Sequence, residues 1–574
     1  MSSGHRLDLI SSGKSAYRIA ISPKAAEPEV FAAAELQRYL RLMTGVEAPI
    51  TERARGGRLM RIGGAANAHL PRNAGEDAFV VRTDGDALIL AGATLYAVYS
   101  FLEDDLGCAW LSPGDEHVPE TDAVSVTALR RVERPDFTSR MIVHFPCPAP
   151  RTRGQIDWMA KRRLSESLLA TNNNLTAWEN GAIPNRVLPE LRRRGLKARA
   201  TGHAFMAWLP AERYAKAHPE YYALVDGVRR TDLSLCISHP AVAREVAANI
   251  GAFADRYPLV ERVTIWHNDH SGWCQCPTCR EWLATPAEQY EELTWKGRRP
   301  GRKSSPSRTA AELRFVNRVA DALKRTHPRL TLETLAYGAN YAPTAAVAPR
   351  ANVASGFAQF DKLLVPEWGS EPVFGGAPGL RVPAKYVAGW RERSARLYIY
   401  EYYGFFHDFS PIWDAMRADF RDYLRRGIHE IGTECGTWND LHMYLFSRLA
   451  WNSRASLDAL LGDWCRGAYG PAAEPMTQFW QGVRRTDLGW NFGALAAKQI
   501  GVKAEEWDAA RRRSTKWVRA DKRSLALLNE AICMLSRSPL ILRFAAASAD
   551  PRALDRVRKL RARWTETPLP WWKS

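Results

Sequence analysis

Three carboxylates end or directly follow short apolar runs of the sequence. Asp269 ends the run RVTIWHND, Glu401 follows RLYIY, and Glu434 lies between small residues in EIGTECG. Hydrolysis of a glycosidic bond needs two carboxyl groups, one to protonate the leaving oxygen and another to attack the sugar or activate water. The three carboxylates are therefore candidate catalytic residues, with Asp269 or Glu434 as general acid/base and Glu401 as nucleophile or base.

Each of these positions also allows a structural interpretation. Asp269 could cap a helix or close a turn, because Asn-Asp after a strand is common at such positions. Glu401 could belong to a salt bridge, because burial among tyrosines raises the pKa of a carboxyl group or forces it to pair. Glu333 lies earlier in its own run, LTLETLAYG, and is interpreted as structural.

Polar and aromatic residues near the ends of similar runs could position a sugar. The set comprises His203, Asn174, Tyr337, Tyr402 and Trp438. Flat rings stack on sugar faces, and the chain contains 21 tryptophans, 19 tyrosines and 19 phenylalanines. Most of these rings must nevertheless belong to the core, and a lone histidine is more often structural than ligand-binding.

Four cysteines could hold a metal ion. Cys274, Cys276 and Cys279 form a C-x-C-x-x-C pattern, and Cys236 lies upstream in SLCISHP. Four thiolates make a closed, structural zinc site, so we expect the sulfurs to converge and no cofactor to serve catalysis. Free thiols, or a disulfide in an exported protein, are the alternatives.

The elements that must position these residues are eight short runs separated by helical stretches, a pattern typical of parallel β/α units. The runs are SRMIVHF at 139, NNNLTAW at 172, LKARATGHA at 196, RVTIWHND at 262, LTLETLAYG at 330, NVASGFAQF at 352, RLYIYEYYG at 396 and EIGTECG at 430. They predict a (β/α)8 barrel, whose active site lies at the carboxyl ends of the strands. A doubly wound sheet is the second choice, since no glycine-rich phosphate loop follows any run.

Two further parts are predicted around this barrel. Residues 1–130 should form a small α/β domain, with a helix over 27–44 and a hairpin turn at Asp84-Gly85-Asp86. The barrel should then span residues 131–455, and residues 456–574 should form a helical domain. The basic segment at 296–309 is expected to be a mobile loop.

Composition narrows the class of partner. The chain has 574 residues and a net charge of +18, with arginines spread along its length. This charge allows an anionic glycan, in which case arginines such as Arg140 and Arg229 should face the site. No nucleic-acid-binding motif and no run of 18 apolar residues is present, so neither nucleic acid nor a membrane is expected as a partner. The localisation stays open, because a removed signal peptide would leave the same sequence.

Several motifs in order resemble a bacterial family called domain of unknown function 4838. They include AAELQRYLRLMTGVEAPI, GHAFMAWLPAERYAKAHPEYYALVDGVRR, NDHSGWCQCPTC and ECGTWNDLHMYLFSRLAWN, and the resemblance covers roughly residues 20 to 470. It implies an N-terminal domain similar to that of α-glucuronidases and β-hexosaminidases, followed by a glycoside-hydrolase-like barrel. Some members are classed as glycoside hydrolase family 163, which are retaining enzymes. The related α-glucuronidases carry carboxylates after strands four, seven and eight, a placement that Asp269, Glu401 and Glu434 resemble.

The working hypothesis is a glycoside hydrolase that acts on an oligosaccharide or polysaccharide, with retention expected from the resemblance alone. The family often has aspartate where this chain has Glu401, and the longer side chain changes the separation of the carboxyl groups. A non-catalytic carbohydrate-binding barrel is the alternative, and a basic protein associated with nucleic acid is a third hypothesis.

Overall fold

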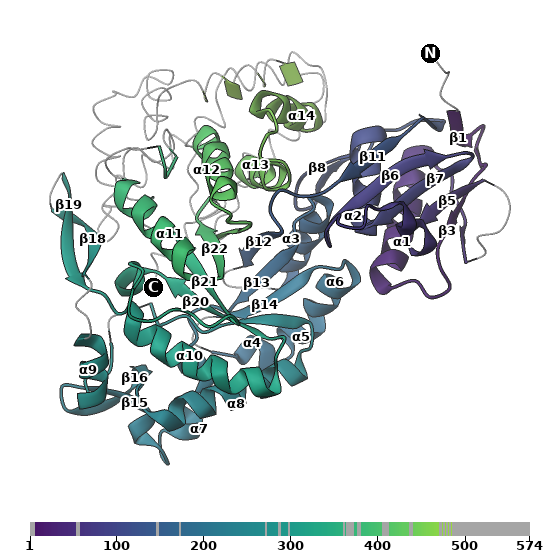
Figure 1. The fold of residues 1–574 in the computed structure, drawn as a ribbon. Helices are drawn as coiled ribbons and strands as arrows, with labels where there is room; N and C mark the ends of the chain where they lie inside the picture. Colours follow the sequence, from purple (N-terminus) through teal and green to yellow (C-terminus); the bar gives the residue numbers. More distant parts are fainter. Residues whose placement is uncertain are drawn as a thin grey trace.

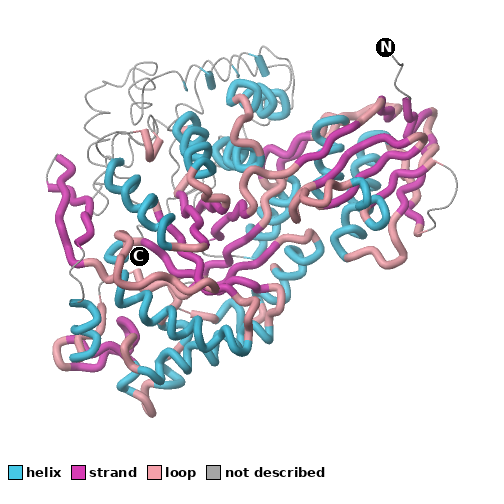
Figure 2. The backbone as a smooth tube through the Cα atoms, in the orientation of Figure 1, coloured by secondary structure: helices cyan, strands magenta, loops and turns pink. Residues whose placement is uncertain are grey.

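The computed structural model describes residues 6–484 of the chain apart from short gaps, and Figures 1 and 2 show its architecture. The gaps are residues 53–57, 145–148, 172–173, 270–271, 285–288, 297–298, 360–361, 363–371, 376–379, 404–411, 435–439, 470–472, 475–476, 478–479 and 482–483. Strands surrounded by helices lie at the centre, and the strands of the N-terminal residues lie to one side (Figure 1).

Eight parallel strands form a closed barrel in the order β12, β13, β14, β17, β20, β21, β22 and β23. Their bounds are Ser139–His144, Glu166–Ala170, Lys197–Thr201, Val260–Thr264, Thr331–Ala336, Val353–Ala358, Arg396–Glu401 and Glu430–Glu434. The (β/α)8 barrel predicted from the sequence is confirmed. Because all eight strands run in parallel, their carboxyl ends meet at one rim.

The second strand lies earlier than predicted. It is Glu166–Ala170, whereas the run NNNLTAW leads into the short helix α4 (Thr176–Glu179). The Asn174 side-chain oxygen accepts the backbone N–H of Thr176 at 3.2 Å, a local bond that favours a turn over a strand. This strand was missed in the sequence because it begins with a charged residue, Glu166.

Helices cover the outside of the barrel (Figure 2). The longer ones are α3 (Ala149–Lys161), α8 (Pro240–Arg256), α10 (Thr309–Thr326), α11 (Arg381–Arg393), α12 (Trp413–Arg425) and α13 (Asp440–Trp451). α10 illustrates why they form: Leu313, Val316 and Leu323 recur at helical spacing and are buried. The helices therefore supply the outer half of the core and fix the strand ends at the rim.

A buried ion-pair network occupies the amino-terminal half of the barrel interior. The Arg199 guanidinium lies 2.8 Å from Glu333 and also pairs with Glu166, and Arg262 lies 2.6 Å from Glu430. Burial opposes the ionisation of Glu166, but the charges of Arg199 and Arg262 outweigh it and hold the pKa of this carboxyl at about 2. The structural interpretation of Glu333 agrees with these contacts.

The N-terminal residues form three sheets, with orders β10-β1-β2, β11-β6-β7-β5-β3-β4 and β8-β9, in which β8 (Ala109–Ser112) pairs with β9 (Asp115–His117). The other strands are β1 (Arg6–Ser11), β2 (Lys14–Ser15), β3 (Arg18–Ala20), β4 (Ile50–Thr51), β5 (Leu59–Ile62), β6 (Phe79–Asp84), β7 (Ala87–Gly92), β10 (Val124–Thr127) and β11 (Arg130–Glu133). The predicted helix is α1 (Glu27–Thr44), and it ends where Gly45 takes the left-handed φ of 73° and donates its N–H to the Arg41 carbonyl. The predicted hairpin joins β6 to β7, with Asp84 opposite Ala87.

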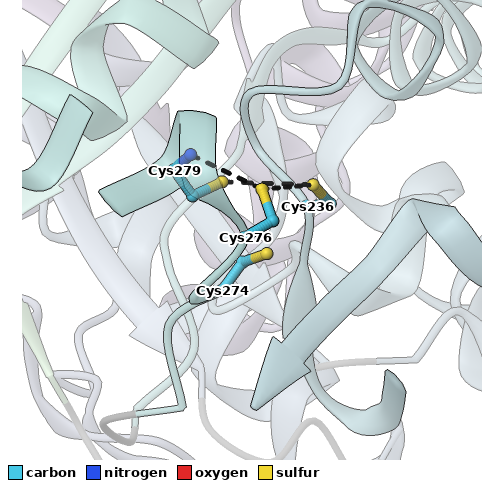
Figure 3. A group of neighbouring side chains, drawn as sticks. All are labelled: Cys236, Cys274, Cys276 and Cys279. Carbon is cyan, nitrogen blue, oxygen red and sulfur yellow. Dashed lines mark hydrogen bonds between the residues drawn. The ribbon is translucent and has the colours of Figure 1, made fainter. Parts of the chain in front are cut away.

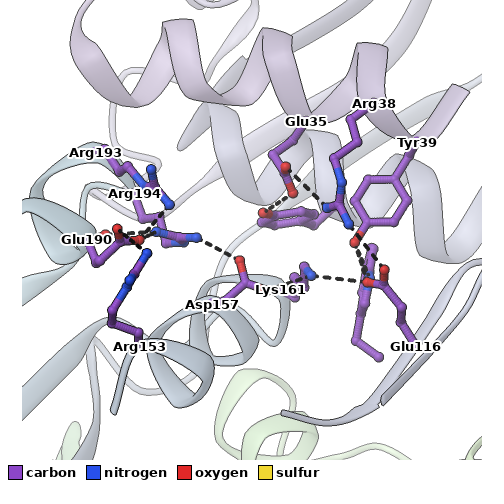
Figure 4. Close-up of polar contacts among 12 residues, drawn as sticks. Glu35, Arg38, Tyr39, Glu116, Arg153, Asp157, Lys161, Glu190, Arg193 and Arg194 are labelled. Carbon is purple, nitrogen blue, oxygen red and sulfur yellow. Dashed lines mark hydrogen bonds and ion pairs between the residues drawn. The ribbon is translucent and has the colours of Figure 1, made fainter. Parts of the chain in front are cut away.

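Polar contacts bind this N-terminal region to the barrel (Figure 4). Lys161 on α3 lies 2.7 Å from Asp157 and 3.2 Å from Glu116 of β9 (Asp115–His117), and Arg194 lies 2.7 Å from Asp157. The Tyr39 hydroxyl on α1 donates to Glu116 at 2.5 Å. These contacts hold α3, the helix that follows the first barrel strand, against the N-terminal sheets.

Two other segments complete the described chain. Gln289–Lys296 (β18) pairs antiparallel with Arg299–Pro306 (β19). The prediction of a disordered or mobile loop is therefore wrong for residues 299–306, because their backbone pairs with the strand before them. The predicted C-terminal helical domain begins with α14 (Leu457–Tyr469), and residues 485–574 lie outside the described residues. None of the helices that the structure describes is both long and apolar enough to cross a bilayer.

Candidate functional site

Glu401 and Glu434 end neighbouring barrel strands but point to opposite sides of the wall. Glu401 stands opposite Thr433, and Tyr400 stands opposite Gly432. Because side chains alternate along a strand, Glu434 shares the face of Gly432 and Tyr400, whereas Glu401 shares the face of Thr433. Tyr400 and Glu434 therefore face the barrel interior, and Glu401 faces the surrounding helices.

Glu401 lies in a closed polar cluster between the wall and α12. Lys362 Nζ is 3.0 Å from Glu401 Oε1 and 2.7 Å from Asp419 Oδ2, and the Tyr423 hydroxyl donates to Glu401 Oε1 at 2.8 Å. All four side chains are buried, and burial above all raises the pKa of Asp419 to about 6. These contacts favour the salt-bridge interpretation of Glu401 over a role as nucleophile or base.

Glu434 has a different environment. Its side chain is buried, and the Tyr400 hydroxyl donates to its Oε2 at 3.0 Å. Burial raises the pKa of Glu434 to about 7, the hydrogen bond from Tyr400 opposes this rise, and the charge of Asp269 adds to it. A carboxyl group with this pKa is half protonated near neutral pH and can donate a proton there.

Asp269 lies at the same part of the rim and is exposed. It follows β17, whose pairing with β14 is extended by a parallel bridge between His203 and Trp266. Its charge acts on Glu434, on Tyr402 and on His203, so these four side chains lie in one neighbourhood. The structure thus brings together Asp269 and Glu434 and turns Glu401 away from them.

Aromatic rings line this neighbourhood. Ring centroids are 5.6 Å apart for Trp266 and Tyr400, 5.2 Å for Tyr400 and Tyr402, and 6.0 Å for His203 and Tyr337. Rings of this kind can stack on the apolar face of a sugar while their polar atoms meet its hydroxyls. Of the predicted sugar-binding residues, His203, Tyr337 and Tyr402 belong to this group.

His203 is held in a defined orientation. Its Nδ1 bonds the backbone oxygen of His267, which makes Nδ1 the protonated nitrogen in the neutral ring. Burial and the neighbouring His267 lower the pKa of His203 below its usual range. The ring is therefore neutral at neutral pH.

A histidine–carboxylate pair next to this group was not foreseen from the sequence. His267 Nδ1 lies 3.0 Å from Glu312 Oε2 on α10, and the Asn340 amide contacts both residues. The His267 ring stands 6.0 Å from that of Trp273. His267 directly precedes Asn268 and Asp269 in the sequence, which was the available signal, but its partner on α10 is identified only by the fold.

The remaining predicted residues have other placements. Asn174 is exposed and lies two residues before α4 and four residues after the end of β13, while Trp438 lies outside the described residues. Arg140 is bonded to the Phe137 carbonyl and to Asp77, and Arg229 to the Tyr222 carbonyl. Arg140 lies near the start of β12, at the end of the barrel opposite the carboxylates. These two arginines therefore give no support to an anionic substrate.

The four predicted metal-binding cysteines converge (Figure 3). The sulfur atoms of Cys236, Cys274, Cys276 and Cys279 all lie within 4.8 Å of one another. Cys236 follows β16 (Val228–Leu235), and the other three come from the loop after Asp269 and the first turn of α9 (Pro277–Ala284). The expected convergence is confirmed.

A surface depression of about 730 Å³ lies elsewhere, over α4, α6 (Leu188–Arg193) and the segment before β17. Trp178, Leu188 and Tyr257 are among its lining residues. It contains none of the predicted site residues, so its shape does not bear on the carboxylates at the rim.

Comparison with known families assigns the chain to one of them. Residues 110–481 match the family described as Domain of unknown function (DUF4838), and this protein belongs to that family. The match contains the whole barrel, including Asp269, Glu434 and the four cysteines. A search of curated proteins finds no match.

Solved structures of similar fold include several glycoside hydrolases. A family GH115 4-O-methyl-α-glucuronidase, BtGH115A, is 15% identical with a TM-score of 0.58, and the alignment covers 97% of this chain and 72% of that one. The N-acetyl-β-hexosaminidase of Streptomyces plicatus is 15% identical with a TM-score of 0.48, and the alignment covers 84% of this chain and 93% of that one. At such identities the first of these likenesses supports the barrel fold alone.

Proposed function

We propose that this protein is a glycoside hydrolase in which Glu434 is the general acid and Asp269 is the second catalytic carboxylate. The observation that carries the proposal is a buried carboxyl group at the carboxyl end of a (β/α)8 barrel, held by the Tyr400 hydroxyl and acted on by the charge of an exposed carboxylate, Asp269. A pair of carboxyl groups in unlike environments is what acid-assisted cleavage of a glycosidic bond requires.

The division of roles follows from the environments. Burial raises the pKa of Glu434 to about 7, so Glu434 can protonate the leaving oxygen near neutral pH. Asp269 is exposed, so water stabilises its ionised form, which can attack the sugar or activate a water molecule. Of the two candidates for general acid that the sequence left open, we thus select Glu434, and we leave Glu401 out of the chemistry.

The surrounding residues fit a sugar ring. Tyr337 and Tyr402 offer ring faces and hydroxyls, and His203 offers a neutral imidazole whose orientation is fixed by the His267 carbonyl. The family GH115 enzyme of similar fold is named for specificity towards decorated arabinogalactans, and it supports the substrate class only by analogy of fold. We propose a carbohydrate substrate and leave its charge unspecified.

The stereochemical outcome depends on the separation of the two carboxyl groups. Separations of about 5 to 5.5 Å accompany retention, and about 6.5 to 9.5 Å leaves room for the water that an inverting enzyme uses. The family resemblance favours retention. Proton NMR of the first product formed distinguishes the two, because it reports the anomer before mutarotation.

Turnover of a panel of natural glycans and aryl glycosides tests the proposal. Wild-type protein should release sugar that chromatography detects, and Glu434→Gln should not. Glu261→Gln is the matched control, because Glu261 is an exposed glutamate of the same barrel and should leave turnover unchanged. Saturable binding of a glycan without product from any substrate would instead support the non-catalytic carbohydrate-binding alternative.

A further inference from the structure

We propose that Cys236, Cys274, Cys276 and Cys279 bind one zinc ion as four thiolates, and that this ion braces the rim loop that carries Asp269. The metal site goes beyond the proposed hydrolase function and does not depend on it. The role of the ion at the rim of the active site rests on that function.

The spacing of the sulfur atoms fits one tetrahedral ion. Zn–S bonds of about 2.3 Å at tetrahedral angles separate the sulfurs by about 3.8 Å. The Cys236 sulfur lies 3.6 Å from that of Cys276 and 4.0 Å from that of Cys279, and all four lie within 4.8 Å of one another. The four sulfurs therefore lie together at separations that one ion can bridge (Figure 3).

Hydrogen-bond donors approach the sulfur atoms as they would approach thiolates. The backbone N–H of Leu224 points at the Cys274 sulfur at 3.3 Å, and that of Cys279 at the Cys276 sulfur at 3.5 Å. The Ser238 hydroxyl accepts from a protonated Cys279 at 3.1 Å and lies 3.7 Å from the Cys276 sulfur, so it can turn to donate once these thiols are ionised. Such outer contacts orient metal ligands and offset their negative charge.

The site is closed by protein ligands. Three of the cysteines are buried and Cys276 is partly buried. Four protein thiolates fill the tetrahedral positions of zinc, so no position is left for substrate or water. The ion would therefore stabilise structure and take no part in the chemistry.

The position of the site explains what it would stabilise. The hairpin of β15 (Tyr222–Val225) and β16 is joined to the rim loop on both sides of Asp269: Asn268 bonds the Leu233 carbonyl, and Gln275 donates to the Leu224 carbonyl at 2.6 Å. The metal would add a link between the end of this hairpin, at Cys236, and the loop, at Cys274 and Cys276. Because the loop also carries Trp273, whose ring lies near His267, loss of the ion should loosen the sugar-binding side of the rim.

Metal analysis of the full chain, purified under reducing conditions, tests the site without reference to activity. We expect about one zinc per chain and, by X-ray absorption, four sulfur neighbours at about 2.3 Å. The double variant Cys276→Ala, Cys279→Ala should contain less than a tenth as much zinc. Cys465→Ala, which removes a buried cysteine of α14, is the matched control and should keep the full content.

Two results would overturn the proposal. The first is a metal-free wild-type protein, or one whose bound metal is iron. The second is a thiol count of five in the denatured, unreduced protein with a chelator present, because the chain has nine cysteines and two disulfides would consume four. We expect nine thiols.

A chelator experiment on the wild-type protein covers the case in which the double variant fails to fold. Removal of zinc by a competing chelator should lower the melting temperature, and addition of zinc should restore it. A melting temperature that does not change while the zinc is removed would contradict the bracing role. If zinc is present but no glycan is cleaved, the metal site stands and the proposed hydrolase function fails.

Discussion

The two ends of the barrel interior treat buried carboxylates in opposite ways. At the amino-terminal end, the buried Glu166 and Glu333 and the partly buried Glu430 lie against the guanidinium groups of Arg199 and Arg262. At the carboxyl end, Glu434 receives a hydrogen bond from the Tyr400 hydroxyl, and the described residues place no lysine or arginine against it.

This difference has opposite effects on ionisation. The arginines hold the pKa of Glu166 at about 2, whereas burial without a paired cation raises that of Glu434 to about 7. Stability contributed by Glu166 is present above its unfolded value of 4.5 and is lost as the pH falls through about 2. Stability contributed by protonated Glu434 is present below 4.5 and is lost as the pH rises through about 7. The charges at the amino-terminal end therefore serve structure, and the environment of Glu434 fits the proton transfer proposed for it.

The largest expected effect comes from the carboxyl end. Glu434→Gln should lower turnover of the natural glycan by about 10² to 10⁴, because the amide keeps the shape but cannot donate the proton. Its kcat/KM on an aryl glycoside with an acidic phenol as leaving group should fall far less, since that leaving group needs no protonation. Asp269→Asn should lose the rate on both substrates. Steady-state kinetics on the two substrates measure this, and equal losses for Glu434→Gln on both would contradict the role of general acid.

A substitution at the amino-terminal end of the barrel interior should lower the stability of the protein. Arg199→Met leaves Glu166 and Glu333 buried with less pairing, and such a loss costs about 3 to 5 kcal/mol. Urea unfolding measures the change in free energy of unfolding. Turnover per folded molecule should stay near that of the wild type, and an unchanged stability would show that the interior network does not act as described.

A variant of Glu401 tests whether this residue contributes to stability, as the carboxylates paired with arginine do, or to turnover, as proposed for Glu434. Glu401→Gln removes the charge that faces Lys362, and hydrogen bonds to charged groups are worth about 1.5 to 3 kcal/mol, so the free energy of unfolding should fall by that amount. Turnover should fall much less than in Glu434→Gln. The opposite result, with stability kept and turnover lost, would restore the nucleophile or base role predicted from the sequence.

The smallest effect is a shift in pH dependence. kcat/KM should fall as the pH rises through about 7, because Glu434 then loses its proton. In Tyr400→Phe the hydrogen bond that lowers the pKa of Glu434 is gone, so this fall should move to higher pH. In Asp269→Asn the like charge is gone, so the pKa of Glu434 should decrease, as ¹³C NMR of labelled glutamate can measure. Shifts in the same direction would contradict the arrangement of these three groups.

Much of the architecture was predictable because it rests on local patterns. Short apolar runs between helical stretches predicted the barrel, and the Asp84-Gly85-Asp86 turn predicted a hairpin that the structure contains. The error at the second strand had a local cause as well, since Glu166 at the start of β13 disguised an apolar run. The cysteine spacing predicted a convergence that the fold then provided.

The sequence by itself determined which strands end in carboxylates, and the alternation of RLYIYE already puts Glu401 on the face of Leu397 and Ile399 rather than of Tyr400. Only the tertiary structure decided which carboxylate has a cation, because Lys362 and Asp419, which meet Glu401, are distant in the chain. The same holds for Asp269 and Glu434, which closure of the barrel brings into one neighbourhood. The ionisation of a buried group depends on the charges around it in space, and no local pattern of residues specifies those.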